Sequence, residues 1–249
     1  MPSFIKPWYQ LGYIIPHLYT DQDAYQFYRV APDGMMLVTT GLNLREYSLA
    51  AVEENLPTLW ERFNLLAQKK VDRISLSGVP VASALGRPKM LEILQEAEAR
   101  TGLVCDTDLE AHIAALKALG ATQIALATRW PEAINQMLTR YLALADIHVL
   151  GCCSRSRSLD QNKGANASDD HELALELGRQ ALQQFPQAQA LLMPGGLWYA
   201  IYAAPQLESE FGKPVLLNIL STTWAALQSA SQPLVQRPQN HWGMLLSRL

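Results

Sequence analysis

The sequence predicts an α/β protein of two pseudo-symmetric, Rossmann-like (flavodoxin-like) halves, each with a parallel sheet, and a site in the cleft between them. Apolar strand patterns alternate with helix patterns along the whole chain, which is typical of parallel α/β folds. An apolar strand followed by a glycine turn and a helix occurs twice, at 74–80 and at 190–196. This repetition indicates an internal duplication. Open α/β sheets bind ligands at the carboxyl ends of their strands, where both turns lie.

The first half is expected to contain four strands joined by helices. Residues 18–32 are polar and aromatic, and we expect a loop or short helix beside the cleft. Pro57 interrupts the helical pattern of 44–70 and is expected to kink or split it, because proline lacks the amide hydrogen that a helix interior uses. Gly120 is a candidate helix C-cap. The expected strands are 12–16, 35–40, 73–77 and 102–105, and the expected helices are 44–70, 88–100 and 108–119.

The second half repeats this alternation. Pro131 suits the first turn of a helix, where its missing amide hydrogen costs nothing. The stretch 154–168 is rich in Ser, Asn, Gln and Gly, and it is too long for a plain connector, so a functional loop is expected there. Ser168 is expected to cap the helix that follows it. The expected strands are 123–127, 148–152, 190–193 and 214–218, and the expected helices are 131–145, 168–185, 203–211 and 222–230.

The expected domain boundaries follow the repeat. Residues 1–118 together with 219–249 are assigned to the first half, and 119–218 to the second. The tail 231–249 is expected to pack back onto the first half, because its apolar side chains, Trp242 among them, need cover.

The composition is that of an ordinary globular protein. The 249 residues are 49% hydrophobic and 17% charged, with a net charge of −3, and no Lys/Arg cluster favours nucleic acid. The N-terminus lacks an apolar signal core, and no run approaches the roughly 18 apolar residues of a membrane span. The three cysteines suggest neither a disulfide framework nor a zinc site. We therefore expect a cytoplasmic protein with reduced thiols; a homo-oligomer is possible.

Four stretches, in order along the chain, carry a resemblance to a known group of enzymes. They are Ser75–Gly78, Leu116–Thr128, Leu192–Leu197 and Trp242–Leu246. Together they resemble the aspartate/glutamate racemase superfamily, and within it the branch of the arylmalonate decarboxylases and maleate cis-trans isomerases. The resemblance implies two similar α/β halves and an active site that uses no cofactor and acts on a small carboxylate.

The resemblance also implies one cysteine at each turn, and this chain departs from it. Gly78-Val79 stands at the first turn and Pro194 at the second, so neither cysteine is present. Decarboxylase-like members carry hydroxyl residues after the first glycine, where this chain has Val79 and Pro80. Racemisation by two thiols is therefore not expected. The loss of the hydroxyl residues indicates a substrate that is less anionic or differently shaped. The cysteines at 105, 152 and 153 are interpreted as core residues.

Three residues at strand ends are candidates for catalysis. His17 follows the first strand and could act as general acid or base near neutral pH, although it could equally be a loop histidine bonded to backbone. Ser77 could supply a hydroxyl group. Arg129 could clamp a carboxylate through two parallel hydrogen bonds, or it could be a surface arginine in the first turn of a helix.

The candidate substrate-binding residues lie in the same turns and loops. Backbone amides of the glycine turns could hold a carboxylate or an enediolate-like oxyanion. Trp130 is expected to form a flat wall, and Trp198 either lines a pocket or packs in the core. The resemblance adds an asparagine in the polar loop that holds a carboxylate. The full set is Gly78, Val79, Trp130, Asn162, Pro194, Gly195, Gly196 and Trp198.

A cluster of acidic residues and a histidine occurs between 106 and 112. Asp106 or Thr107 is expected to be the N-cap of the helix that begins at Asp108. Asp108 and His112 are four residues apart and share one helix face, but two such groups do not make a metal site, and no metal or cofactor is expected.

Three functions are compatible with the sequence. The first is a cofactor-independent lyase or isomerase acting on a small carboxylate, with decarboxylation preferred because it depends on charge stabilisation more than on a pair of thiols. The acid would be His17 or a bound water. The second is a ligand-binding protein that has lost the thiol chemistry. The third is hydrolysis or ring opening of a cyclic amide by activated water.

Overall fold

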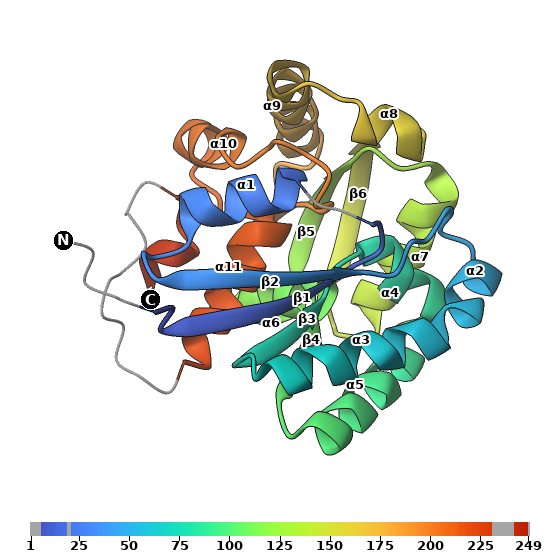
Figure 1. The fold of residues 1–249 in the computed structure, drawn as a ribbon. Helices are drawn as coiled ribbons and strands as arrows, with labels where there is room; N and C mark the ends of the chain where they lie inside the picture. Colours follow the sequence, from blue (N-terminus) through green and yellow to red (C-terminus); the bar gives the residue numbers. More distant parts are fainter. Residues whose placement is uncertain (1–5, 19–20, 231–241, 249) are drawn as a thin grey trace.

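The first half is a four-stranded parallel sheet with the strand order β2-β1-β3-β4 (Figure 1). The computed structural model of the protein describes residues 6–18, 21–230 and 242–248. Within the sheet, β1 pairs in parallel with β2 on one side and with β3 on the other. The strands are β1 (Tyr9–Ile15), β2 (Met35–Gly41), β3 (Arg73–Leu76) and β4 (Val104–Thr107).

The second half has the same topology. Its strand order is β6-β5-β7-β8, so that each strand corresponds to the strand four places earlier in the chain. All of its strand pairs are parallel. The strands are β5 (Gln123–Thr128), β6 (His148–Ser154), β7 (Ala190–Met193) and β8 (Val215–Leu217). The predicted fold of two similar α/β halves is confirmed.

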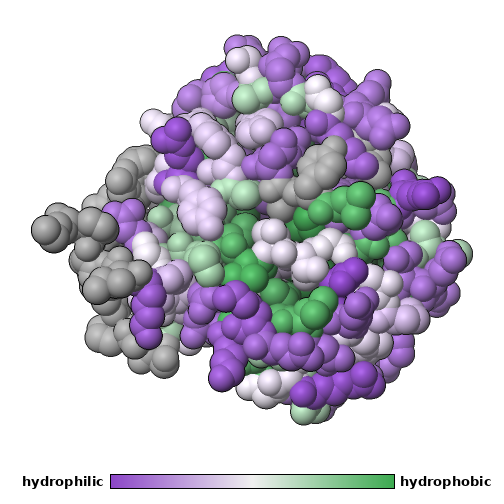
Figure 2. All heavy atoms as spheres, in the orientation of Figure 1, coloured by the Kyte–Doolittle hydropathy of each residue, from purple (hydrophilic) through white to green (hydrophobic). Residues whose placement is uncertain are grey.

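Helices connect the strands in both halves. The first half contains α1 (Asp21–Val30), α2 (Leu49–Glu54), α3 (Leu56–Lys69), α4 (Val79–Leu85), α5 (Arg87–Thr101) and α6 (Asp108–Leu119). The helices between the strands of the second half are α7 (Glu132–Ala143), α8 (Leu159–Lys163), α9 (Ala167–Gln184) and α10 (Ala203–Phe211), and α11 (Asn218–Gln228) follows its last strand. A short 3-10 helix covers Leu246–Arg248. In Figure 2, the apolar residues on this face gather over β1 and β2, with hydrophilic residues around them.

Several local predictions are confirmed. Pro57 stands in the first turn of α3 and splits the long helical pattern into α2 and α3. The side chain of Thr107 accepts a hydrogen bond from the amide of Glu110 and caps α6, which ends at Gly120 in the left-handed conformation. That conformation suits glycine because it has no Cβ.

Other local predictions are wrong. Helix α4 follows Gly78 directly and was not predicted, because its seven apolar and small residues lack helical periodicity. Pro131 is the N-cap of α7 rather than its first residue, and Asn166 caps α9 in place of Ser168. The polar stretch 154–168 contains α8, whose small size hides it in the sequence.

The two halves meet through helices that follow their last strands. Helix α11 packs against α6 and also against α1. The described end of the tail contacts α10, because the Trp242 ring lies 5.3 Å from that of Tyr202 and the Met244 amide donates to Glu208. Arg248 also donates to the carbonyl of Ala118 in α6 at 3.5 Å, so the described part of the tail contacts both halves, and 231–241 lie outside the described residues. The domain boundaries themselves stay a prediction.

Candidate active site

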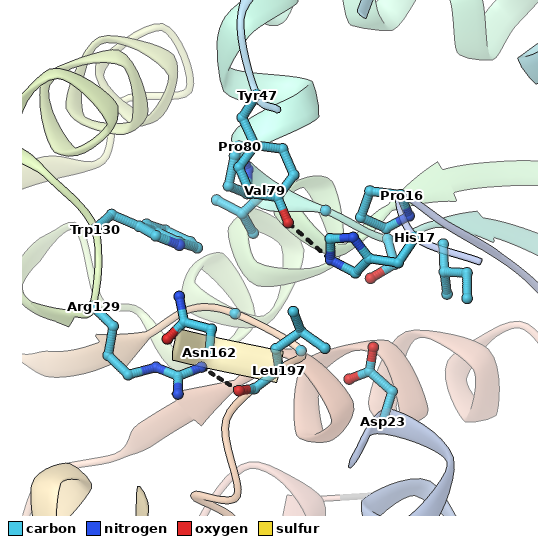
Figure 3. A pocket seen from close by; sticks show the side chains of 15 residues that line it. Pro16, His17, Asp23, Tyr47, Val79, Pro80, Arg129, Trp130, Asn162 and Leu197 are labelled. Atoms are coloured by element: carbon cyan, nitrogen blue, oxygen red, sulfur yellow. Dashed lines mark hydrogen bonds between the residues drawn. The ribbon is translucent and has the colours of Figure 1, made fainter. Parts of the chain in front are cut away.

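A small cavity of about 40 Å³ lies where the turns that follow β3 and β7 approach each other (Figure 3). Both turns stand at the carboxyl ends of parallel strands, as the fold predicts. The lining residues come from both halves. They are Ile15, Pro16, His17, Asp23, Tyr47, Ser77, Gly78, Val79, Pro80, Arg129, Trp130, Asn162, Gly195, Gly196 and Leu197.

His17 forms one wall of the cavity together with Tyr47. Its Nε2 and the Tyr47 hydroxyl are 2.9 Å apart, and its Nδ1 is buried with no hydrogen-bond partner among the described residues. Burial lowers the pKa of His17 to about 4, and the nearby charge of Lys163 acts in the same direction. Burial raises the pKa of Tyr47, which remains a neutral phenol. The expected alternative, a loop histidine bonded to backbone, does not describe this side chain.

Arg129 lies on the opposite side of the cavity (Figure 3) and is buried. Its Nη1 donates to Asp170 at 3.0 Å, and its Nη2 donates to the carbonyl of Leu197. Asp170 also accepts from Arg157 at 2.9 Å. Burial lowers the pKa of Arg129 to about 10, so the guanidinium is charged at neutral pH. Two of its five N–H groups are used in these bonds, and the others can still bind a ligand.

Asn162 and Trp130 extend this side of the cavity. Asn162 comes from α8, only 6% of it is exposed, and its Oδ1 has no hydrogen-bond partner within the described part of the chain. Trp130 is buried and faces the second turn, since a Cβ on Gly195 would lie 3.4 Å from its ring. Across the cavity, Val79 and Pro80 add apolar surface.

Asp23 is a lining residue that was not predicted. It lies on α1, is buried, and packs so closely on Gly196 that a Cβ there would lie 2.3 Å from its Oδ2. The polar and aromatic stretch 18–32 was expected beside the cleft, but nothing in it singled out one acid. Tyr47, which follows β2, carried no signal at all.

The amides of the two turns are not all open to a ligand. The amide of Gly78 donates to Oδ2 of Asp108 at 3.2 Å, and that of Gly195 donates to Oδ1 of Asn218 at 2.9 Å. The expectation that the amides of Gly78 and Gly195 bind an anion is therefore wrong, and the same expectation for the amide of Gly196 stays a prediction. Asp108 and Asn218 begin α6 and α11, behind the turns, and they hold the backbone from that side.

Ser77 is engaged in the same buried network. Its hydroxyl donates to Asp108 at 2.8 Å and accepts from the hydroxyl of Tyr13 at 2.9 Å. Burial raises the pKa of Asp108 to about 6, against the opposing effect of the Ser77 hydrogen bond. These bonds assign Ser77 to the support of the first turn rather than to a free hydroxyl, and its predicted catalytic role has no support in this geometry.

Two predicted substrate-binding residues do not line the cavity. Trp198 is buried behind Arg129, 4.9 Å from the guanidinium, and its indole N–H donates to the Asp170 carbonyl at 2.9 Å. Pro194 is buried where its turn begins. Both residues shape the site from behind. Of the two alternatives expected for Trp198, core packing is the one observed, and its indole N–H has a hydrogen-bond partner in the core.

Comparison with known proteins places the chain in a family. The sequence profile described as arylmalonate decarboxylase matches residues 12–241. The chain belongs to the arylmalonate decarboxylase family. A curated relative, the arylmalonate decarboxylase of Bordetella bronchiseptica, is 25% identical over 211 residues, which are 84% of this chain and 86% of the relative.

Solved structures of this family and of maleate isomerase share the fold. A crystal structure of arylmalonate decarboxylase matches with a TM-score of 0.80 and 23% identity, over 96% of this chain and 99% of the other. A maleate isomerase from Pseudomonas putida S16 matches with a TM-score of 0.80 and 17% identity, over 96% of this chain and 98% of the other.

No cysteine is among the residues that line the described cavity, although the sequence resemblance implied one at each turn. Burial raises the pKa of the Cys105 and Cys152 thiols to about 11 and that of Cys153 as well, which is typical of unreactive core cysteines. The described residues hold no group of three or more His, Cys, Asp or Glu placed to bind a metal ion. None of their helices is long and apolar enough to cross a membrane.

Proposed function

We propose that this protein is a cofactor-independent decarboxylase of a small, malonate-type carboxylate, in which His17 supplies the proton. The observation that carries the proposal is the His17–Tyr47 pair in the cavity, opposite Arg129 and Asn162. It puts a titratable imidazole and a carboxylate-binding guanidinium in one enclosed space. Arylmalonate decarboxylase, the family to which the chain belongs, gives the reaction class.

The retained carboxylate binds between Arg129 and Asn162. The guanidinium supplies charge and unused N–H donors, and the Asn162 side-chain amide supplies further donors. Asp170 and the Leu197 carbonyl fix the guanidinium, so little conformational entropy is lost when it binds an anion.

The leaving carboxylate faces the apolar wall of Val79 and Pro80. This wall offers no side-chain hydroxyl, and Pro80 has no amide hydrogen, so a carboxylate is poorly solvated there. Carbon dioxide is neutral and suffers no such penalty. The difference favours loss of the carboxylate over its binding.

The bond changes balance as follows. The bond from the α-carbon to the leaving carboxylate breaks, CO2 departs, and the electron pair spreads into the retained carboxylate as an enediolate. The imidazolium of His17 then gives a proton to the α-carbon, and a proton from solvent restores it. Each turnover consumes one proton and releases one CO2, with no redox change.

The test is turnover of a panel of malonates, maleate, hydantoins and amino acids, followed by CO2 release and product analysis. Malonate decarboxylation that falls at least about 100-fold in His17→Ala, and not in the surface variant His148→Ala, supports the proposal. Decarboxylation that persists in His17→Ala contradicts the role of His17. Binding without turnover of any compound supports instead a ligand-binding protein that has lost the thiol chemistry, and metal-dependent ring opening would support hydrolysis.

A further inference from the structure

Asp23 and Arg129 give the cavity two ends of opposite charge. Arg129 enters from one side and Asp23 from the other, with Leu197 between them (Figure 3). Both side chains are 4% exposed. A ligand that spans this row of residues meets a cation at one end and a carboxylate at the other.

The contact between Asp23 and Gly196 fixes the position of this carboxylate. The carboxylate oxygens lie 2.3 and 2.4 Å from where a Cβ of residue 196 would be, so only glycine leaves room for them. A carboxylate has about four acceptor positions, and it can accept from a ligand in addition to the bonds it makes within the protein. The close packing holds it against the second turn, on the wall of the cavity.

Asp23 disfavours a further anionic group beside it, because like charges in a buried site repel strongly. It favours an N–H donor or an ammonium group in the same place. The rest of the cavity agrees with a low capacity for anions, since the amides of Gly78 and Gly195 are bonded to Asp108 and Asn218, and Val79 and Pro80 offer no hydroxyl.

We infer that the substrate carries, on its α-carbon, a nitrogen that donates to Asp23, while its retained carboxylate binds at Arg129 and Asn162. The substrate class is an amino- or acylamino-substituted malonate rather than an alkyl- or arylmalonate. This inference rests on the proposed decarboxylase function and specifies its substrate. The small volume of the cavity, about 40 Å³, favours a compact substituent over an aryl ring.

For the simplest member, the reaction balances without an added reagent. Aminomalonate loses one carboxylate as CO2, the electron pair remains on the α-carbon as an enediolate, and one proton is taken up there. The product is glycine. The ammonium group keeps its proton and its contact with Asp23 throughout.

The experiment compares aminomalonate with methylmalonate, which replaces the ammonium group by a methyl group of similar size. Binding to the purified protein is measured by calorimetry and thermal shift, separately from turnover. We expect aminomalonate to bind at least about tenfold more tightly. In Asp23→Asn the ratio of the methylmalonate and aminomalonate dissociation constants should fall towards one. Asp21→Asn, at an exposed position on the same helix turn, should retain the ratio of the original protein.

The outcomes separate this inference from the proposed function. Equal or tighter binding of methylmalonate, binding of neither compound, or an unchanged preference in Asp23→Asn overturns the inference. Turnover of another malonate with any of those results leaves the decarboxylase proposal standing. Tight binding of aminomalonate without CO2 release supports the inference about the ligand and contradicts the decarboxylase. If Asp23→Asn fails to fold, the preference of the unmodified protein decides alone.

Discussion

The side-chain amide of Asn218 donates to Oδ2 of Asp108 at 2.7 Å, and this hydrogen bond joins the two halves directly behind the cavity. Asp108 is the first residue of α6 and Asn218 the first residue of α11, so the two occupy equivalent positions in the repeated topology. Each accepts the amide of the glycine turn in its own half. The bond therefore couples the two turns to each other.

His112 completes this network. Its Nε2 is 2.9 Å from Oδ1 of Asn218, and its Nδ1 is 2.8 Å from the hydroxyl of Ser221. Burial lowers its pKa to about 4, so the ring is neutral at physiological pH. The Nε2–H then donates to Asn218, which orients that amide group toward Asp108.

Asp108→Asn should change the pH dependence of stability. The folded-state pKa of Asp108 is about 6, above its ordinary value of 3.8, so its ionised form costs stability as the pH rises through this window. The variant cannot ionise, so its unfolding free energy relative to the original protein should improve between about pH 4 and pH 7, by on the order of 3 kcal/mol. Denaturant titrations at several pH values measure this difference. A difference that does not vary with pH contradicts the raised pKa of Asp108.

The rate of the proposed reaction should rise as the pH falls. The pKa of His17 is lowered to about 4 in the free protein, so below neutral pH each unit of acid increases the imidazolium fraction about tenfold until that pKa is reached. Lys163→Gln removes a charge that lowers this pKa and should move the profile of kcat/KM to higher pH. The exposed Lys117→Gln is the control. A general base at position 17 would give the opposite slope.

Gly196→Ala should destabilise the protein although the backbone of residue 196 does not adopt a positive φ. The new Cβ would lie 2.3 Å from Oδ2 of Asp23, and displacement of that buried carboxylate should cost about 1–3 kcal/mol. Gly164→Ala is the matched control, because its φ is −90° and its nearest neighbour lies 3.4 Å away. Thermal unfolding compares the two variants, and equal midpoints would contradict the close packing at Gly196.

Arg129→Lys should be destabilising despite the conserved charge. One ammonium group cannot replace the guanidinium on both Asp170 and the Leu197 carbonyl, so a buried acceptor loses its donor, at a cost of about 2–4 kcal/mol. The exposed pair of Arg179 and Glu210 is the comparison, and Arg179→Lys should change stability much less, because exposed ion pairs are screened by solvent. Similar chemical denaturation midpoints for the two variants would refute this difference.

The fold was predictable because its signals are local and repeated. The runs at 74–76 and 190–193 are apolar and end in glycine turns, and burial on both faces of a parallel sheet requires such runs. Helix α4 was missed for the same physical reason that makes it part of the core. It is apolar almost all round, so no helical period shows.

The site was predictable where a residue follows directly on a strand, and at Asn162 through the family resemblance. His17, Arg129 and Trp130 follow β1 and β5 and do line the cavity. Asp23 and Tyr47 lie on connecting segments, and chain folding rather than a motif brings them there. Their roles in binding and catalysis stay proposals. In the sequence, Asp108 resembles any acidic residue in the first turn of a helix. Only the packing of α11 on α6 shows that it faces the other half.

The backbone of each turn is hydrogen-bonded from behind, by Asp108 in the first turn and by Asn218 in the second. The residues that hold the turns in place are thus distinct from Val79 and Pro80, which line the cavity. The side chains of Val79 and Pro80 take no part in the hydrogen bond that holds the first turn. Positions 79 and 80 are therefore the first choice for introducing another proton donor or anion-binding group into the cavity.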